Sequence, residues 1–254
     1  MLSEDFTFEG EIFLFLILNR RSAGGGKIRE GKYVMRFKSN LDISVAGGIV
    51  EIIKDMPRHN VLAYVNKNTM GEEFYREAEA SLDDGYMYVI LSSTGSAAGE
   101  LIRSVTKKDY SHASLSFDAG LKTLLSYNGG NNLFSPGMNH EFLKSFYKKE
   151  DANLLIYKIK ATNEQKQTIL DEVRKIDKEG SSYNLIGLLL PYSHKENIMF
   201  CSQFVYSVLK KANLAYFEKE AYDVKPMDFV ELDLKRKLEF HSKLHLKDII
   251  ADSI

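Results

Sequence analysis

Residues 111–132 read SHASLSFDAGLKTLLSYNGGNN, a segment in which two runs of mostly small and apolar residues flank a turn. The first run, Ser111 to Phe117, alternates in character and ends at Asp118-Ala119-Gly120. The second run, Lys122 to Tyr127, ends at a stretch rich in asparagine and glycine. Alternation with a period of two, interrupted by turn residues, is typical of a β-hairpin. We therefore expect two antiparallel strands here.

Strand and helix patterns lie on both sides of this hairpin. Residues 86–91, Tyr-Met-Tyr-Val-Ile-Leu, predict a buried strand, and a helix is expected between Ser96 and Lys108. A further strand is expected over residues 153–159. The next helix is expected to begin at Thr162, because Thr162 and Gln165 have the spacing of a capping box. This mixture indicates an α+β domain, with boundaries that we place at residues 85–254.

The first 84 residues predict a separate, smaller α+β region. Residues 11–18, 32–38 and 61–66 have the composition of strands, and residues 71–82 have apolar side chains at helical spacing. The role of residues 1–84 does not follow from any motif in them.

Composition excludes several classes of protein. The chain has 254 residues, of which 44% are hydrophobic and 27% charged, and its net charge is −1, so it is neither disordered nor collagen-like. The near-neutral charge gives no basic footprint for nucleic acid, and we expect no nucleic-acid partner. A single cysteine excludes an internal disulfide.

The N-terminal sequence gives no export signal. It begins with acidic residues, and its apolar stretch from Ile12 to Leu18 is too short for a bilayer span and has no cleavage site after it. We expect a cytoplasmic protein without a transmembrane segment, which could reach an external substrate through lysis or in a phage particle.

The single cysteine, Cys201, lies in the segment Phe200-Cys201-Ser202-Gln203-Phe204-Val205, at the predicted start of an amphipathic helix. A thiol in the first turn of a helix lies near the positive end of the helix dipole and near free backbone N–H groups, which lower its pKa. This position suits a nucleophile. The alternative is a buried cysteine that serves only as a small hydrophobic side chain.

Among the six histidines, His112 is placed best to act as a general base. It begins a predicted strand, in Ser111-His112-Ala113-Ser114, and small residues flank it. The alternative is a solvated or core histidine without a role in chemistry. No histidine forms a metal-binding motif with Cys201, so we expect no metal and no cofactor.

A strand and helix, then the Ser111-His112-Ala113-Ser114 strand and, about ninety residues later, the Phe200-Cys201-Ser202-Gln203-Phe204-Val205 helix resemble one known family. This family is the circularly permuted papain-like cysteine hydrolases of NlpC type. They include YiiX-like amidases and relatives of lecithin:retinol acyltransferase. In this branch the histidine precedes the cysteine, as it does here, and the resemblance covers about residues 85–240.

The resemblance implies a permuted papain-like fold with a central antiparallel sheet and a helix that carries the cysteine. It implies Cys201 as the nucleophile, His112 as the general base, and a third polar group that orients the imidazole. Ser126 lies closest to the family's third position, and Asn128, on the same face of the strand, is the alternative. Family members often have His, Glu or Asn there.

The chemistry implied is attack of the thiolate on an amide, through a thioacyl intermediate, in a peptide, isopeptide or cell-wall peptide. One alternative is an acyltransferase or lipid hydrolase with an acyl substrate. The other is a catalytically inactive binding module on the same fold. The sequence does not identify the substrate or the oligomeric state.

Overall fold

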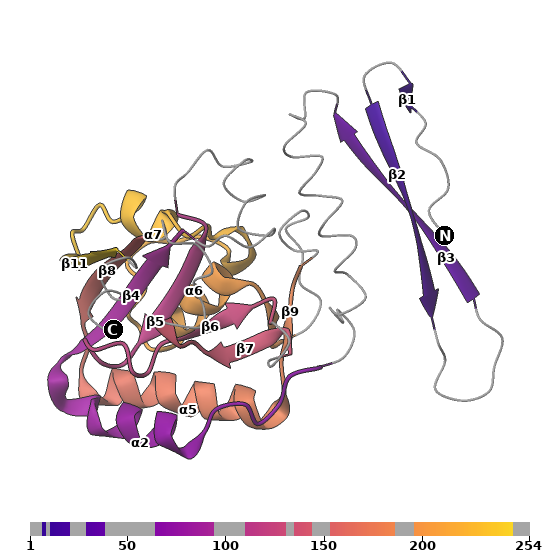
Figure 1. Ribbon diagram of the computed structural model, residues 1–254. Helices are drawn as coiled ribbons and strands as arrows, with labels where there is room; N and C mark the ends of the chain where they lie inside the picture. Colours follow the sequence, from indigo (N-terminus) through magenta and orange to yellow (C-terminus); the bar gives the residue numbers. More distant parts are fainter. Residues whose placement is uncertain are drawn as a thin grey trace. The chain divides into compact units, whose positions relative to one another are not determined.

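The computed structural model describes the backbone of residues 7–8, 11–20, 29–38, 64–93, 110–130, 135–143, 153–185 and 196–245. The chain divides into two compact units, residues 1–47 and 48–254. In the first unit, the described part is an antiparallel sheet in the order β1-β2-β3 (Figure 1). Its strands are β1 (Thr7–Phe8), β2 (Glu11–Arg20) and β3 (Arg29–Lys38). The strands predicted at residues 11–18 and 32–38 are therefore confirmed.

The second unit is built on a six-stranded antiparallel sheet with the strand order β11-β8-β4-β5-β6-β7. The strands are β4 (Tyr86–Ser92), β5 (His112–Ser116), β6 (Leu125–Asn128), β7 (Gly137–His140), β8 (Asn153–Lys160) and β11 (Leu238–His245). Two short strands, β9 (Ser182–Tyr183) and β10 (Ile198–Met199), pair in parallel beside it. With its helices, this sheet confirms the α+β class.

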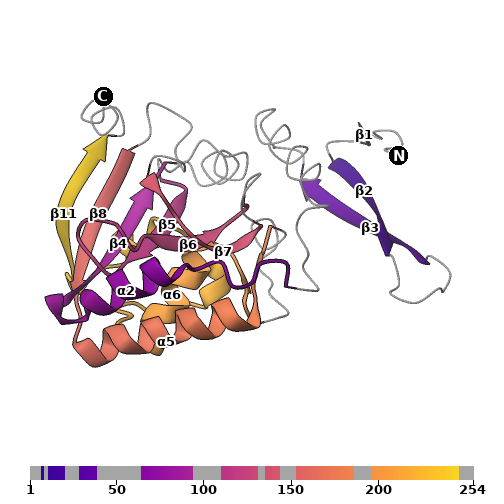
Figure 2. The same cartoon turned by 60° about the horizontal axis from the view of Figure 1, so that its bottom comes forward.

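Three helices of the second unit pack with the sheet (Figures 1 and 2). They are α2 (Glu72–Ala80), α5 (Asn163–Glu179) and α6 (Cys201–Lys211), and shorter turns form η2 (Leu82–Asp84), η4 (Ala221–Asp223) and α7 (Asp228–Glu231). The predicted capping box at the start of α5 is confirmed, because the Thr162 side chain accepts from the Gln165 backbone and the Gln165 side chain from the Thr162 backbone.

Apolar contacts fix α6 across the middle strands of the sheet. The rings of Phe204 on α6 and Tyr127 on β6 lie 5.0 Å apart, and both side chains are fully buried. Burial of two aromatic side chains gives a large hydrophobic contribution and a defined orientation. The N-terminus of α6 is thereby held at the sheet beside β5 and β6.

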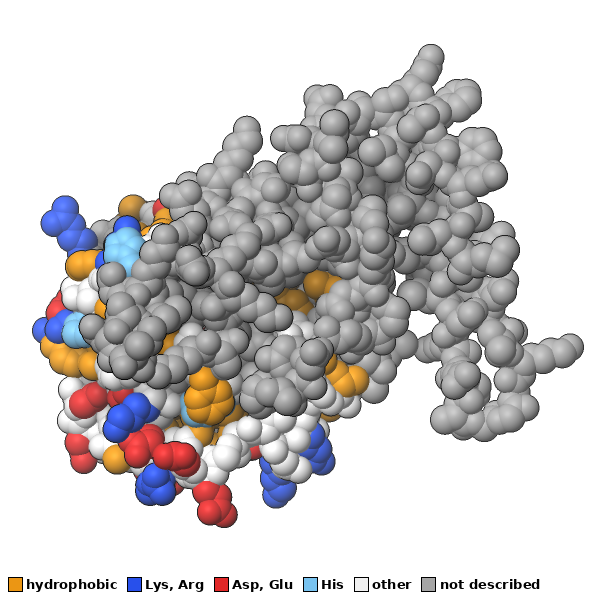
Figure 3. Space-filling view, viewed as in Figure 1, with side chains coloured by type: hydrophobic (Ala, Val, Ile, Leu, Met, Phe, Trp, Pro, Cys, Tyr) orange, Lys and Arg blue, Asp and Glu red, His pale blue; other side chains and the backbone are white. Residues whose placement is uncertain are grey.

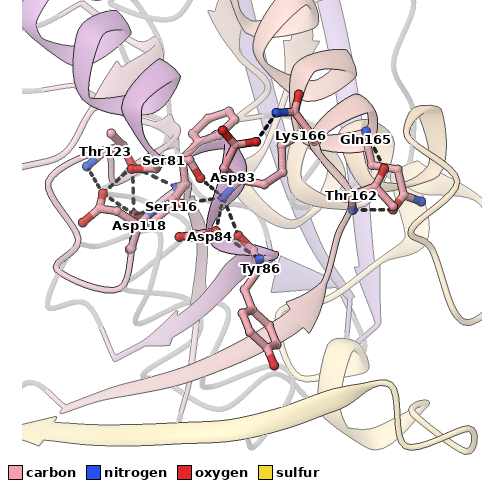
Figure 4. Close-up of polar contacts among 12 residues, drawn as sticks. Ser81, Asp83, Asp84, Tyr86, Ser116, Asp118, Thr123, Thr162, Gln165 and Lys166 are labelled. Carbon is pink, nitrogen blue, oxygen red and sulfur yellow. Dashed lines mark hydrogen bonds and ion pairs between the residues drawn. The ribbon is translucent and has the colours of Figure 1, made fainter.

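A buried lysine joins the neighbouring ends of strands β4 and β5 (Figure 4). The Nζ atom of Lys166 on α5 donates to the carbonyl oxygens of Tyr86, at the start of β4, and Phe117, just after β5, at 2.7 and 2.9 Å. It also contacts the carbonyl oxygen of Ser81 and the carboxylate of Asp84. Burial lowers the pKa of Lys166. The hydrogen bond and the charge of Asp84 favour the ammonium and offset part of this decrease. Lys166 therefore joins α5 to η2, β4 and β5.

The structure differs from the sequence predictions in three places. Residues 48–84 belong to the second unit, rather than to a region that ends at residue 84, because Asn66 bridges to Ser181 and because α2 buries Phe74 in this unit. In the predicted strand at residues 61–66, the described part contains only that bridge. The second hairpin strand begins at Leu125 instead of residue 122.

The later start of β6 has a local cause. The Asp118 carboxylate accepts hydrogen bonds from the backbone N–H groups of Lys122 and Thr123, at 3.1 and 2.9 Å. These bonds hold residues 118–123 in a turn, which delays the strand. The helix expected between Ser96 and Lys108 lies outside the described residues.

The surface of the second unit carries both signs of charge. Red and blue side chains lie beside one another in Figure 3, in agreement with exposed pairs such as Lys122 with Glu77, at 3.3 Å, and Arg174 with Glu79. Exposed pairs of this kind contribute little to stability. Among the described segments, no helix has the length and apolar character that a bilayer span requires.

Candidate active site

His112 is the first residue of β5, an inner strand of the six-stranded sheet. Ser114, two residues further along β5, points to the same face of the sheet. Both side chains are buried, with 6% of His112 and 1% of Ser114 exposed. The small residues around the histidine, seen in the sequence, therefore line a buried strand.

Cys201 is the first residue of α6, as the amphipathic pattern predicted. Strand β10 ends at Met199, and Phe200, with φ −103° and ψ 173°, is the extended residue that precedes the helix. Phe200 provides no side-chain cap for the first-turn N–H groups. The thiol therefore lies at the positive end of the helix dipole, where an anion is stabilised.

Cys201 and His112 are about ninety residues apart in sequence, and the fold brings them close enough for each to shift the pKa of the other. Burial raises the pKa of the Cys201 thiol, but the charge of the His112 imidazolium, its hydrogen bond and backbone hydrogen bonds at Ala113 and Ser202 outweigh that effect and lower the pKa. Burial alone lowers the pKa of His112, but the charges of Glu141 and of the Cys201 thiolate raise it to about 10. Each of the two groups thus favours the charged form of the other.

A buried carboxylate, Glu141, lies on the other side of the imidazole. It follows β7 directly, and its Oε1 atom is 3.0 Å from His112 Nε2. Ser114 donates a hydrogen bond of 2.6 Å to Oε2 of Glu141. Burial raises the pKa of Glu141, but the His112 charge and the hydrogen bonds from His112, Ser114 and Ser126 lower it below its ordinary value. Glu141 is therefore ionised at neutral pH although only 2% of it is exposed.

Both residues that the sequence offered as orienters lie at this carboxylate. Ser126 Oγ is 3.0 Å from His112 Nε2 and also donates to Glu141 Oε1. Asn128 Nδ2 donates to the same oxygen at 3.1 Å. Ser126 thus contacts both the ring and the carboxylate, whereas Asn128 donates to the carboxylate.

Sequence reasoning missed Glu141. The fold brings it to His112 through β7, a four-residue strand that no periodicity revealed. One signal was present, because Glu141 is the single acidic residue between Asp118 and Glu150. A carboxylate that is alone in a long segment beside a candidate base is a reasonable partner for that base.

Tyr183 on β9 is a second neighbour of the thiol that the sequence did not reveal. Burial, followed by the negative charge of Cys201, raises the pKa of this phenol well above its ordinary value. The phenol is therefore neutral at any physiological pH. A neutral phenol near the thiol adds no charge to the site.

Comparisons with protein-family models, curated proteins and solved structures gave no match. The chemistry of the site therefore rests on its own geometry. Among the residues that the structure describes, no group of three or more His, Cys, Asp and Glu side chains is arranged to hold a metal ion. The other described histidine near the site, His140, directs Nε2 to the carbonyl oxygen of Lys122 at 2.8 Å and has its ring against Phe74.

The arrangement provides three chemical capabilities. Cys201 is a candidate nucleophile, and His112, whose Nε2 lies 3.0 Å from both Glu141 and Ser126, is a candidate for moving a proton. Glu141 stabilises the imidazolium and fixes the ring plane. The backbone N–H of Cys201, at the start of α6, is a candidate donor for a negatively charged oxygen.

Proposed function

We propose that this chain is a cysteine-dependent hydrolase that cleaves an amide bond through a thioacyl intermediate, on a papain-like fold of permuted order. The observation that carries the proposal is the proximity of Cys201, at the N-terminus of α6, to His112, whose Nε2 lies 3.0 Å from the buried Glu141. An ion pair of this kind is expensive to bury without a compensating role.

In the first half of the reaction, Sγ of Cys201 attacks the carbonyl carbon of the substrate, and a C–S bond forms. The backbone N–H of Cys201 stabilises the negative oxygen of the tetrahedral intermediate. The C–N bond then breaks, and His112 gives its proton to the leaving nitrogen. The products of this half are a thioester on Cys201 and a free amine.

In the second half, His112 takes a proton from a water molecule, and the water oxygen attacks the thioester carbon. The C–S bond breaks, the carboxylic acid leaves, and the thiolate and imidazolium form again. Glu141 keeps its charge throughout and stabilises His112 in its protonated form. The third group of the site is then a carboxylate, supported by Ser126, in place of Ser126 alone.

The first test is the pH dependence of Cys201 alkylation by iodoacetamide in wild type and in His112→Ala, with mass spectrometry to quantify the modified thiol. Wild-type Cys201 should react well below pH 8.5, the ordinary thiol pKa being about 8.5, and His112→Ala should lose this low-pH reactivity. His241→Ala removes an exposed histidine on β11 and is the matched control.

The second test uses a panel of peptide and isopeptide amides together with acyl esters. A mass increase on Cys201 that equals the acyl group, followed by release of acid, supports the hydrolase, and preference for acyl esters would favour the acyltransferase or lipid hydrolase. A thiol with normal pKa and no acylation would overturn the proposal in favour of a binding module.

A further inference from the structure

Three asparagine side chains form a chain of hydrogen bonds that ends at Glu141. Asn66 Nδ2 donates to Asn139 Oδ1 at 3.0 Å, and Asn139 Nδ2 donates to Asn128 Oδ1 at 3.0 Å. Asn128 Nδ2 then donates to Glu141 Oε1 at 3.1 Å. Each of the two inner amides accepts from one neighbour and donates to the next, so the N–H groups along the chain point toward the carboxylate.

The surroundings fix the orientation of the central amide. Asn139 Nδ2 also faces the carbonyl oxygens of Ser135 and Gly137, at 3.0 and 3.1 Å, so a reversed amide would place its oxygen against two carbonyls. Only 1% of Asn139 is exposed. Asn128 is held in a similar way, because its Oδ1 also accepts from the backbone N–H of Gly130 at 3.0 Å.

The side-chain amide of Asn66, the outermost of the three, is fixed in an orientation that leaves its oxygen unpaired within the described part of the chain. Asn66 Nδ2 faces the carbonyl oxygens of Ser135 and Met138 besides Asn139, at 3.0 and 3.1 Å. Its Oδ1 atom is buried and has no hydrogen-bond partner among the described residues. Leaving a buried acceptor unpaired is unfavourable. The fold thus keeps the N–H group directed toward the asparagine chain at the expense of the carbonyl end.

The backbone at Asn66 is also clamped. The N–H of Asn66 donates to the Ser181 carbonyl at 3.0 Å, and the Ser181 N–H donates to the Asn66 carbonyl at 2.7 Å. Gly137 packs against the same place, since a Cβ atom there would lie 2.6 Å from Ser181 Oγ. The asparagine chain therefore starts from a rigid support.

We propose that Asn128 and Asn139 are positioning residues that hold the Glu141 carboxylate against His112, with Asn66 as their outer anchor. This inference rests on the proposed function and deepens it, because it adds to the site a segment that precedes the resembling region. The aligned N–H groups favour the ionised carboxylate and fix the place of Oε1. Asn66 and Asn139 act through other residues, because their side-chain amides donate to backbone carbonyls and to the next asparagine in the chain.

The test measures the pH midpoint of Cys201 alkylation and the melting temperature of the full chain in wild type, Asn128→Leu and Asn139→Leu. Leucine has nearly the size of asparagine but cannot donate. Loss of one of the hydrogen bonds to Glu141 in Asn128→Leu should raise the midpoint by about 0.5 to 1 unit, and low-pH alkylation should fall about three- to tenfold. Asn139→Leu should shift the midpoint in the same direction by less.

The control is Tyr75→Phe, which removes a 3.0 Å hydrogen bond to Asp177 away from the asparagine chain. It should lower the melting temperature and leave the midpoint unchanged. If both leucine variants melt earlier but keep the wild-type midpoint, the asparagines have only a structural role and the inference is overturned. If Asn139→Leu does not fold, the half-buried Asn128 position decides.

Failure of the inference differs from failure of the proposed function. A wild-type chain with low-pH reactivity and unshifted asparagine variants refutes only the positioning role. A wild-type chain without low-pH reactivity overturns the hydrolase and the positioning role together.

Discussion

The substitution Glu141→Gln isolates the charge of the buried carboxylate. Glutamine keeps the size and shape of the side chain and can still accept from Ser126 or Ser114, but it carries no charge to stabilise the imidazolium 3.0 Å away. A hydrogen bond to a charged group contributes about 1.5–3 kcal/mol, and one pKa unit corresponds to about 1.36 kcal/mol. We therefore expect the pKa of His112 to fall by about one to two units.

The same energy is lost by the thiolate–imidazolium pair, so the pKa of Cys201 should rise by about one to two units. At a pH below both midpoints, the rate of iodoacetamide alkylation should be about ten- to hundredfold lower than in wild type. The assay compares the shapes of the pH profiles, since limited access to the buried thiol lowers the rate of both proteins equally.

The matched control is Glu79→Gln, the same change at an exposed carboxylate on α2. Its alkylation profile should coincide with that of wild type. A Glu141→Gln profile that also coincides with wild type would refute the reasoning, because the charge of Glu141 would then have no effect on the pKa of Cys201.

Four further outcomes are expected. Lys166→Met leaves several buried oxygens without a donor and should lower the free energy of unfolding in urea by about 3–5 kcal/mol, whereas a loss below 1 kcal/mol would mean that the lysine is dispensable. Gly137→Ala, with φ +149° and a Cβ atom 2.6 Å from Ser181 Oγ, should cost about 1–3 kcal/mol; an unchanged melting temperature would contradict the close packing. Thr162→Ala should cost about 1 kcal/mol in the same urea measurement through loss of the α5 cap, and no loss would show that the cap is replaceable. The folded-state pKa of His112, about 10, exceeds its ordinary value of 6.5, so the stabilisation of the fold by the imidazolium is complete below pH 6.5 and is lost as the pH rises through 10. The difference in unfolding free energy between wild type and Glu141→Gln should therefore become smaller between pH 6.5 and 10. A constant difference would argue against the ion pair of His112 and Glu141.

Local signals in the sequence predicted the regular parts of the fold. The run of apolar residues at 86–91 gave β4, and the Thr162 and Gln165 spacing gave the start of α5, because both patterns depend on neighbours in the chain. Strand β7 was missed, since Gly137-Met138-Asn139-His140 is short and has no apolar alternation. It is a strand because β6 offers it a partner, which is a tertiary effect.

The candidate site likewise contains residues that local sequence patterns predicted and one residue that they did not. The position of Cys201 at a helix start and of His112 at a strand start followed from local patterns, while the expectation that they meet came from the family resemblance. The partnership of Glu141 with His112 depends on the pairing of β7 with β6, with Leu125 opposite His140, so no local pattern contains it. The third group of the site was therefore the part least accessible to sequence reasoning.

The order of the site residues along the chain has a consequence for biosynthesis. His112, Glu141 and five of the six strands of the large sheet are translated before Cys201. At about 5–20 residues per second, the ribosome needs about 5 to 20 s to add the roughly ninety residues between the histidine and the cysteine. During this interval the nascent sheet can pair its strands with no thiol in the chain. The reactive atom enters only when the strands that will surround it already exist, which limits the time in which an exposed thiol could be oxidised before folding.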